Sequence, residues 1–257
     1  MAKQHDIKLN KGLGQHFLKD TEVLRKIVWA IDDNIKEEIP FVEVGPGAGA
    51  LTQFIYKREG LKLIEFDTRW AELLKEKYPS LKDSIYNLDF LKMELDTIYD
   101  SMAVIGNFPY NISSQILFKV LDYKENVPYV LGMFQKEVAL RICSKPGNKT
   151  YGILSVLLQA FYEATYLFDV PREAFNPPPK VMSGVLILKR REHLTLPCNE
   201  KFLKQIVKQS FGQRRKTLRN SLKSFIKTEE IRELSIFDLR PEALGVDGFI
   251  NLTNLLE

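Results

Sequence analysis

The chain has 257 residues, of which 45% are apolar and 27% charged, so it can form one large domain and a smaller second one. This composition excludes a disordered chain, and no apolar run reaches the roughly 18 residues that a membrane span needs. The formal charge of +4 is only weak support for a polyanionic partner. Two cysteines and three scattered histidines match neither a metal site nor a disulfide framework. We therefore expect a cytoplasmic protein that holds no metal.

A helical pattern comes first along the chain. Apolar residues recur at helical spacing over 20–35, where Asp20 or Thr21 can serve as the N-cap. From residue 41 onward, short apolar runs alternate with amphipathic segments, which indicates βα units and a mostly parallel sheet. The predicted strands are 41–44, 62–66, 84–88, 103–106, 129–134, 162–169 and 181–189.

The last two predicted strands have no clear helix between them, so we expect an antiparallel hairpin that closes one edge of the sheet. After Pro197 the strand signals cease, and the remaining residues have helical spacing. The sequence therefore predicts a sheet domain over 1–193 and a small helical domain over 194–257.

The first predicted strand runs into a glycine-rich loop that is followed by a helical pattern over 50–57. Glycines allow a close approach of the backbone to a ligand, and the helix start offers unpaired N–H groups. Gly45, Gly47 and Ala50 also satisfy the dinucleotide pattern G-x-G-x-x-G/A. A nicotinamide or flavin enzyme therefore stays an alternative at this point.

Two carboxylates follow the next two predicted strands. Glu65 is placed where it can accept hydrogen bonds from both hydroxyls of a ribose, although a salt-bridged strand end is the alternative, and Asp67 could take the same role. Asp89 can accept from an adenine amino group, or it can simply begin a turn. In open α/β sheets ligands bind beyond the carboxyl ends of the strands, so Gly45, Glu65, Asp89 and Asn107 should face one crevice.

The turn Asn107-Phe108-Pro109-Tyr110 follows the fourth predicted strand. Taken alone, Pro109 could merely stop the strand. A different reading suits the chemistry of an adenine amine, whose lone pair is delocalised into the ring. If the Asn107 side-chain oxygen and the Phe108 carbonyl each accept one N–H, the lone pair is turned toward an electrophile. The sulfonium methyl of S-adenosylmethionine is such an electrophile, and Tyr110 would stack on the extruded base while Pro109 keeps the turn rigid.

Several segments together give the chain a recognisable pattern. It resembles the adenine N6,N6-dimethyltransferases of ribosomal RNA, and within them the bacterial small-subunit group. The resemblance covers nearly the whole chain and rests on the segments 12–18, 43–47, 64–67, 107–113, 134–137, 175–181 and 211–218. It implies an α/β fold of the class I methyltransferase (Rossmann-like) type, with a seven-stranded sheet that has an antiparallel edge hairpin and a small all-helical C-terminal domain.

The resemblance also implies roles for particular residues. His16 and Leu18 would close over the methionine end of S-adenosylmethionine, and Phe175 would form a second aromatic wall opposite Tyr110. His16 stands where many relatives carry Asn, and Phe108 stands where Leu or Ile is usual. Neither change removes a required group, because His16 keeps a hydrogen-bond donor and residue 108 acts through its main chain.

Basic residues are the candidates for RNA contact. The densest cluster is Arg214, Arg215, Lys216 and Arg219, with little acidic compensation nearby in the sequence. Phosphate contacts of this kind provide affinity without sequence information. A solvated helix face is the alternative. We also expect Lys11 on the N-terminal arm and Lys180 to contact RNA.

The resemblance thus implies an enzyme that dimethylates N6 of two adjacent adenosines in a hairpin loop near the 3′ end of small-subunit (16S) rRNA, and we expect it to be a monomer. Its partner would be that rRNA within an immature small ribosomal subunit. A large-subunit (23S) rRNA methyltransferase that confers macrolide resistance is one alternative. A non-catalytic ribosome-assembly or transcription factor on the same fold is another.

Overall fold

The structure is a computed structural model and describes residues 16–257. It divides the chain into two compact units. The first contains the described residues up to Ala139 together with Thr165–Arg190, and the second contains Leu140–Ala164 together with Arg191–Glu257. The predicted domain boundary after residue 193 lies close to the last of these divisions. Residues 140–164, which the sequence pattern left in the sheet domain, group with the C-terminal helices.

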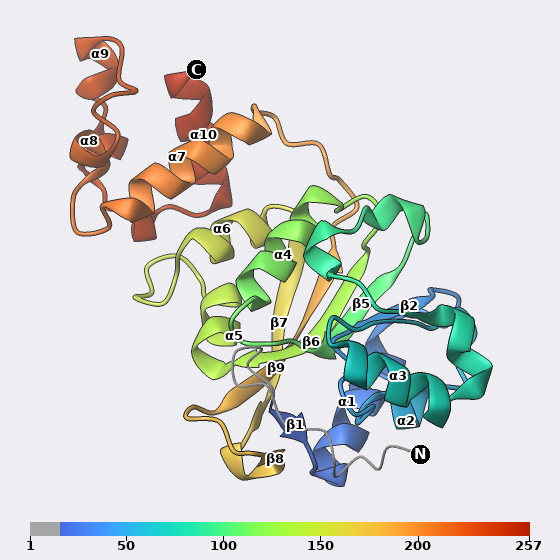
Figure 1. The fold of residues 1–257 in the computed structure, drawn as a ribbon. Helices are drawn as coiled ribbons and strands as arrows, with labels where there is room; N and C mark the ends of the chain where they lie inside the picture. Colours follow the sequence, from blue (N-terminus) through green and yellow to red (C-terminus); the bar gives the residue numbers. More distant parts are fainter. Residues whose placement is uncertain (1–15) are drawn as a thin grey trace. The chain divides into compact units, whose positions relative to one another are not determined.

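Seven strands form the main sheet in the order β4-β3-β2-β5-β6-β9-β7 (Figure 1). Their bounds are β2 Phe41–Val44, β3 Lys62–Ile64, β4 Ile85–Tyr86, β5 Ala103–Asn107, β6 Tyr129–Gln135, β7 Tyr162–Val170 and β9 Ser183–Arg190. The pairs from β4 to β6 are parallel, whereas β9 runs antiparallel to β6. The predicted seven-stranded sheet with an antiparallel edge is therefore confirmed.

Strand β3 ends two residues earlier than the apolar pattern predicts. The reason is local: the Glu65 carboxylate accepts the Asp67 N–H at 2.8 Å, and the Asp67 side chain then caps helix α3 (Thr68–Lys77). A chain that turns in this way leaves the sheet. The turn places Glu65 at the carboxyl end of the sheet.

Helix α1 (Thr21–Asn34) confirms the first predicted helix. The Asp20 side chain accepts from the backbone N–H groups of Glu22 and Val23, which satisfies two of the free donors at the helix start. One face of α1 is buried in the core of the first unit. The other helices of this part of the chain are α2 Thr52–Ile55, α4 Ser113–Asp122 and α5 Lys136–Ile142.

A separate two-stranded ribbon pairs β1 (Phe17–Leu18) with β8 (Phe175–Asn176) in antiparallel register (Figure 1). Leu18 lies opposite Phe175, and both side chains are buried in the core of the first unit. This ribbon fixes the start of the described chain beside the segment that leads into β9. Sequence patterning did not predict it, because two residues are too few to show a period.

The second unit contains the helices α6 Ile153–Gln159, α7 Glu200–Gly212, α8 Leu218–Ser221, α9 Glu229–Arg232 and α10 Val246–Leu256. Phe211 joins them, since its ring lies 5.8 Å from that of Phe249 and 6.2 Å from that of Tyr151. Helix α7 packs against both α6 and α10. The predicted helical character of the C-terminal residues is confirmed.

Within residues 16–257, no helix is long and apolar enough to cross a membrane.

Candidate functional site

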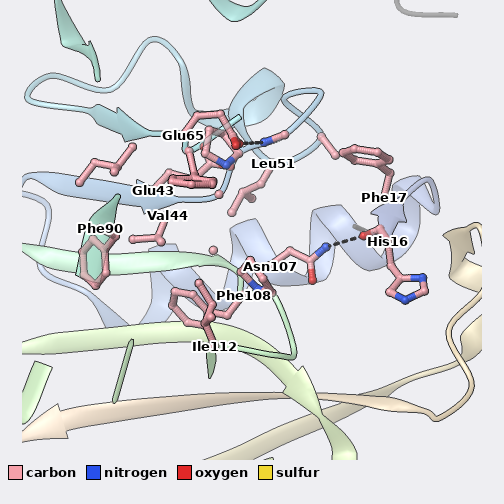
Figure 2. A pocket seen from close by; sticks show the side chains of 18 of the residues that line it. His16, Phe17, Glu43, Val44, Leu51, Glu65, Phe90, Asn107, Phe108 and Ile112 are labelled. Atoms are coloured by element: carbon pink, nitrogen blue, oxygen red, sulfur yellow. Dashed lines mark hydrogen bonds between the residues drawn. The ribbon is translucent and has the colours of Figure 1, made fainter. Parts of the chain in front are cut away.

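One pocket lies beyond the carboxyl ends of β2, β3, β4 and β5, with a cavity volume of about 290 Å³ (Figure 2). It brings together ten of the predicted site residues from five separate segments. They are His16, Leu18, Gly45, Gly47, Glu65, Asp89, Asn107, Phe108, Pro109 and Tyr110. The crevice expected from the ends of the parallel strands is therefore present.

The glycine loop after β2 has a backbone that other residues rarely adopt. Gly45 has φ +67° and Gly47 has φ +54°, both in the left-handed region. A Cβ atom at Gly47 would also lie 2.5 Å from the Phe17 ring. Conformation and close packing thus both require glycine at position 47, and the loop backbone forms one wall of the pocket.

Glu65 holds the loop in place. Its carboxylate accepts the Gly47 N–H and the Asp67 N–H, each at 2.8 Å. The side chain is buried, which raises the pKa of this carboxyl, while the two backbone hydrogen bonds act in the opposite direction. Each carboxylate oxygen retains a lone pair, so Glu65 can still accept hydrogen bonds from a ligand.

Glu43 is a second buried carboxyl group on the pocket wall, and sequence reasoning gave it no role. It is 2% exposed and accepts a hydrogen bond from the Thr52 hydroxyl at 2.8 Å. Burial raises its pKa to about 8, against the hydrogen bond from Thr52 and with a further increase from Glu65. The sequence did contain one sign of this residue: Glu43 is a lone acidic residue within an apolar strand, and such a residue needs a hydrogen-bond partner when it is buried.

Asp89 begins the short 3-10 turn Phe90–Lys92, where its side chain accepts the Leu91 N–H at 3.0 Å. This is the structural role that the sequence left as an alternative, and Asp89 nevertheless lines the pocket. Two large apolar side chains lie at the same edge with much of their surface in solvent: Phe66 is 60% exposed and Leu88 is 49% exposed. Such a pair offers a flat apolar ligand two surfaces.

Asn107, the last residue of β5, has a fixed side-chain orientation. Its Nδ2 donates to the His16 carbonyl oxygen at 3.0 Å (Figure 2). Because the amide nitrogen is used in this hydrogen bond within the protein, Oδ1 is left as the acceptor that faces the pocket. The sequence predicted an oxygen acceptor at this position but gave no sign of the residue that orients it.

Phe108 is anchored by its ring. The side chain is fully buried, and its ring centroid lies 5.0 Å from that of Phe134. Gly132 on the neighbouring strand makes room, because a Cβ atom there would lie 2.1 Å from Phe108 Cε2. The Phe108 N–H donates to the Met133 carbonyl at 3.2 Å. The backbone that carries the Phe108 carbonyl is therefore held from β6.

Tyr110 is half-buried beside these groups. Its hydroxyl shares a hydrogen bond with Ser183, and its ring stacks on the His16 imidazole with centroids 5.7 Å apart and planes at 26°. Burial raises the pKa of the Tyr110 hydroxyl, and the bond to Ser183 lowers it. His16 is held in turn by a 2.9 Å contact between Nδ1 and the Pro177 carbonyl.

Phe175 lies in β8, in the hydrophobic core, and is 1% exposed. It does not line the pocket described above, and it borders a smaller depression that Lys19 and Arg172 also line. Its predicted role as an aromatic wall opposite Tyr110 therefore stays a prediction.

The predicted RNA-binding residues fall into three groups. Lys11 lies outside the described residues. Lys180, Arg215 and Lys216 are exposed. Arg214 pairs with Glu242 at 3.8 Å, and Arg219 pairs with Glu233 at 3.3 Å and with Asp238 at 2.7 Å.

The acidic compensation that the sequence did not show is thus supplied by residues farther along the chain. Arg214–Lys216 lie in the turn between α7 and α8 and not on a helix face.

Among residues 16–257, no three His, Cys, Asp or Glu side chains come close enough to hold a metal ion.

Comparisons with known proteins agree with this geometry. The family model described as ribosomal RNA adenine dimethylase matches residues 6–243. A protein from Cytophaga hutchinsonii named ribosomal RNA small subunit methyltransferase A is 52% identical, over 97% of this chain and 98% of the relative. A protein of the same name from Flavobacterium johnsoniae is 50% identical, over 98% of this chain and 97% of the relative.

Two solved structures share the fold at 25% identity. A dimethyladenosine transferase from Plasmodium falciparum has a TM-score of 0.76, with 92% of this chain and 96% of that chain covered. The 23S rRNA methyltransferase ErmE has a TM-score of 0.67, with 93% and 99% covered. A match to the family model over most of the chain, and relatives at half identity along nearly its full length, lead to one conclusion: this chain belongs to the ribosomal RNA adenine dimethylase family.

Proposed function

We propose that this chain transfers two methyl groups from S-adenosylmethionine to N6 of each of two adjacent adenosines in a hairpin loop near the 3′ end of small-subunit rRNA. The observation that carries the proposal is the orientation of Asn107. Its amide nitrogen is engaged by the His16 carbonyl, so its oxygen is available as an acceptor at the edge of a cofactor-sized pocket. The small-subunit substrate follows the name of the relatives at half identity.

The pocket residues fit S-adenosylmethionine. The glycine loop at Gly45 and Gly47 brings bare backbone to the pocket wall, and Glu65 can accept from ribose hydroxyls. Phe66 and Leu88 present apolar surface to the same pocket near Asp89, where an adenine ring would bind. His16 and Leu18 would cover the methionine end. When bound, the cofactor supplies an activated sulfonium methyl group.

The protein's part in the reaction is to position the target amine. Asn107 Oδ1 and the Phe108 carbonyl would each accept one N–H of the adenine N6, which localises the nitrogen lone pair toward the pocket. Tyr110 would stack on the base, as enzymes that act on extruded bases require apolar walls. No strong base is needed before attack, and one N–H proton is lost for each methyl group gained. Holding the reactants at near-attack distance supplies much of the acceleration.

Exposed basic residues would hold the RNA. Arg215 and Lys216 lie in the turn between α7 and α8, and Lys180 lies in the segment before β9. Lys11 on the N-terminal arm would add a further phosphate contact. Such contacts suit an irregular, folded RNA that is recognised by shape and by unstacked bases. We further propose that the enzyme acts as a monomer on immature small subunits in the cytoplasm.

The test uses purified protein and labelled S-adenosylmethionine, with two substrates side by side. Immature small subunits that lack the modification should accept methyl groups, whereas naked large-subunit rRNA should not. Asn107→Ala should reduce transfer at least about a hundredfold, because the acceptor that positions the amine is gone. It should leave cofactor binding within about twofold.

Asn34→Ala is the matched control, since Asn34 donates to a helix carbonyl on α1 and lines no part of the pocket. It should retain full transfer. Equal transfer to large-subunit rRNA would overturn the substrate assignment, and cofactor binding without transfer to either RNA would favour an assembly factor.

A further inference from the structure

Tyr110 is held both at its main chain and at its hydroxyl. At its backbone end, the Ser113 hydroxyl donates to the Tyr110 carbonyl oxygen at 3.2 Å. At its far end, the Tyr110 hydroxyl and the Ser183 hydroxyl lie 2.5 Å apart. A tyrosine side chain can change its χ1 rotamer, whereas a hydrogen bond at the hydroxyl fixes the far end of the ring and so the direction of the ring axis. Ser183 therefore fixes where the far end of the ring lies, while the plane of the ring is restrained by its stacking on His16.

Ser183 is itself a rigid anchor. It is fully buried, and it is the first residue of β9, directly opposite Gln135 at the end of β6. Strand β6 is paired in turn with β5, where Met133 lies opposite Asn107. Asn107, which would accept the target amine, and Ser183, which holds the aromatic ring, thus lie at the same end of three paired strands, β5, β6 and β9.

The residue after Ser183 also restricts the strand. A Cβ atom at Gly184 would lie 2.5 Å from the Tyr166 hydroxyl oxygen, so this part of β9 is closely covered. Ser183 has little room to move, and its hydroxyl points to the Tyr110 side of the strand. A buried hydroxyl in such a place needs a partner, and Tyr110 provides it.

We propose that Ser183 is a positioning residue of the methyl-transfer site, which acts by holding the far end of the Tyr110 ring where the target adenine stacks on it. Ser183 does not contact the substrate. The inference rests on the proposed function, because it gives Tyr110 the role of a stacking platform. It adds a residue at the start of β9, distant in sequence from the catalytic turn, on which the rate of transfer depends.

The experiment is a double-mutant cycle with Ser183→Ala, Tyr110→Phe and the double variant. Tyr110→Phe keeps the ring and removes only the anchored hydroxyl. If Ser183 acts through that hydroxyl, each single variant should lower kcat by roughly tenfold, and the double variant should be no slower than either one. The KM for S-adenosylmethionine should stay within about twofold in all three.

A second readout does not require methyl transfer. Single-stranded RNA with 2-aminopurine in place of the target adenine should lose fluorescence when it stacks on Tyr110 in the wild type, and should lose less in Ser183→Ala. Ser183→Thr keeps the hydroxyl and should restore both the quenching and kcat. Thermal unfolding of each variant identifies any general loss of structure.

The inference is overturned if the two single effects multiply in the double variant, or if Ser183→Ala leaves both kcat and quenching unchanged. The failure of the proposed function has a different signature. In that case the wild type itself does not methylate small subunits, while the fluorescence cycle still reports whether Ser183 and Tyr110 act as one unit.

Discussion

At the scale of single residues, Glu43 is a buried carboxyl group whose protonation should affect stability. Its pKa is raised from 4.5 to about 8. Between these values the folded protein keeps a proton that the unfolded chain has released, so stability falls as pH rises through this range. Glu43→Gln cannot lose that proton and keeps an oxygen for Thr52. Relative to that of the wild type, the free energy of unfolding of the variant should increase by up to roughly 1.4 kcal/mol for each pH unit between pH 5 and 8.

Urea unfolding at several pH values measures this difference. Glu22→Gln is the control, because Glu22 lies on the exposed face of α1 in a surface ion pair with Arg25. Its stability curve should run parallel to that of the wild type. Parallel curves for Glu43→Gln as well would show that Glu43 is ionised in the folded protein at neutral pH.

The residue scale also shows what the sequence could and could not reveal about the site. Gly45, Glu65, Asp89 and Asn107 were predictable, because each follows a strand and the ends of parallel strands meet at one edge. The contacts that orient these groups were not. The Asn107 amide is oriented by the His16 carbonyl, and Tyr110 by Ser183. Both partners are distant in sequence and have no pattern of their own.

At the scale of elements, β5 and β6 are coupled by the Phe108 ring and Gly132. Gly132→Ala would place a Cβ atom 2.1 Å from Phe108 Cε2 and 2.9 Å from the Gly106 carbonyl oxygen. We expect a loss of about 1–3 kcal/mol of unfolding free energy from this overpacking. Adding Phe108→Leu should recover part of it, because the smaller side chain vacates the space that the new methyl group needs.

Chemical denaturation of the two single variants and the double variant measures that coupling. Gly212→Ala is the control, since a Cβ atom there meets nothing within 4 Å. It should change the unfolding free energy by less than about 0.5 kcal/mol. Strictly additive effects at positions 108 and 132 would mean that the Phe108 ring does not depend on the space beside Gly132.

The strands themselves could be predicted from apolar runs in the sequence. The contact between Phe108 and Gly132 depends on the register of β5 and β6, which such runs do not specify.

At the scale of the whole molecule, two kinds of basic residue must be distinguished. Arg219 is engaged by Asp238 and Glu233, whereas Arg215 and Lys216 are exposed. The sequence showed the basic cluster but not its acidic partners, because the chain brings residues 233–242 back to it only when folded. Phosphate binding should therefore depend on Arg215 and Lys216 more than on Arg219.

Arg215→Ala and Lys216→Ala should each weaken RNA binding and reduce the slope of log affinity against log salt by about one unit. Binding titrations from low to moderate salt measure this slope. Lys36→Ala is the control, because it removes an exposed lysine that follows α1, and it should leave the salt slope unchanged. An unaltered slope in both Arg215→Ala and Lys216→Ala would place the RNA on another surface.

The central claim is that the crevice around Asn107 positions an adenine N6 for methyl transfer to small-subunit rRNA. The most direct measurement is mass spectrometry of nuclease digests from immature small subunits after incubation with S-adenosylmethionine and either the wild type or Asn107→Ala. The account predicts N6,N6-dimethyladenosine at two adjacent positions with the wild type and none with the variant. Methylation at another atom or base, or dimethylation by Asn107→Ala at the wild-type rate, would contradict it.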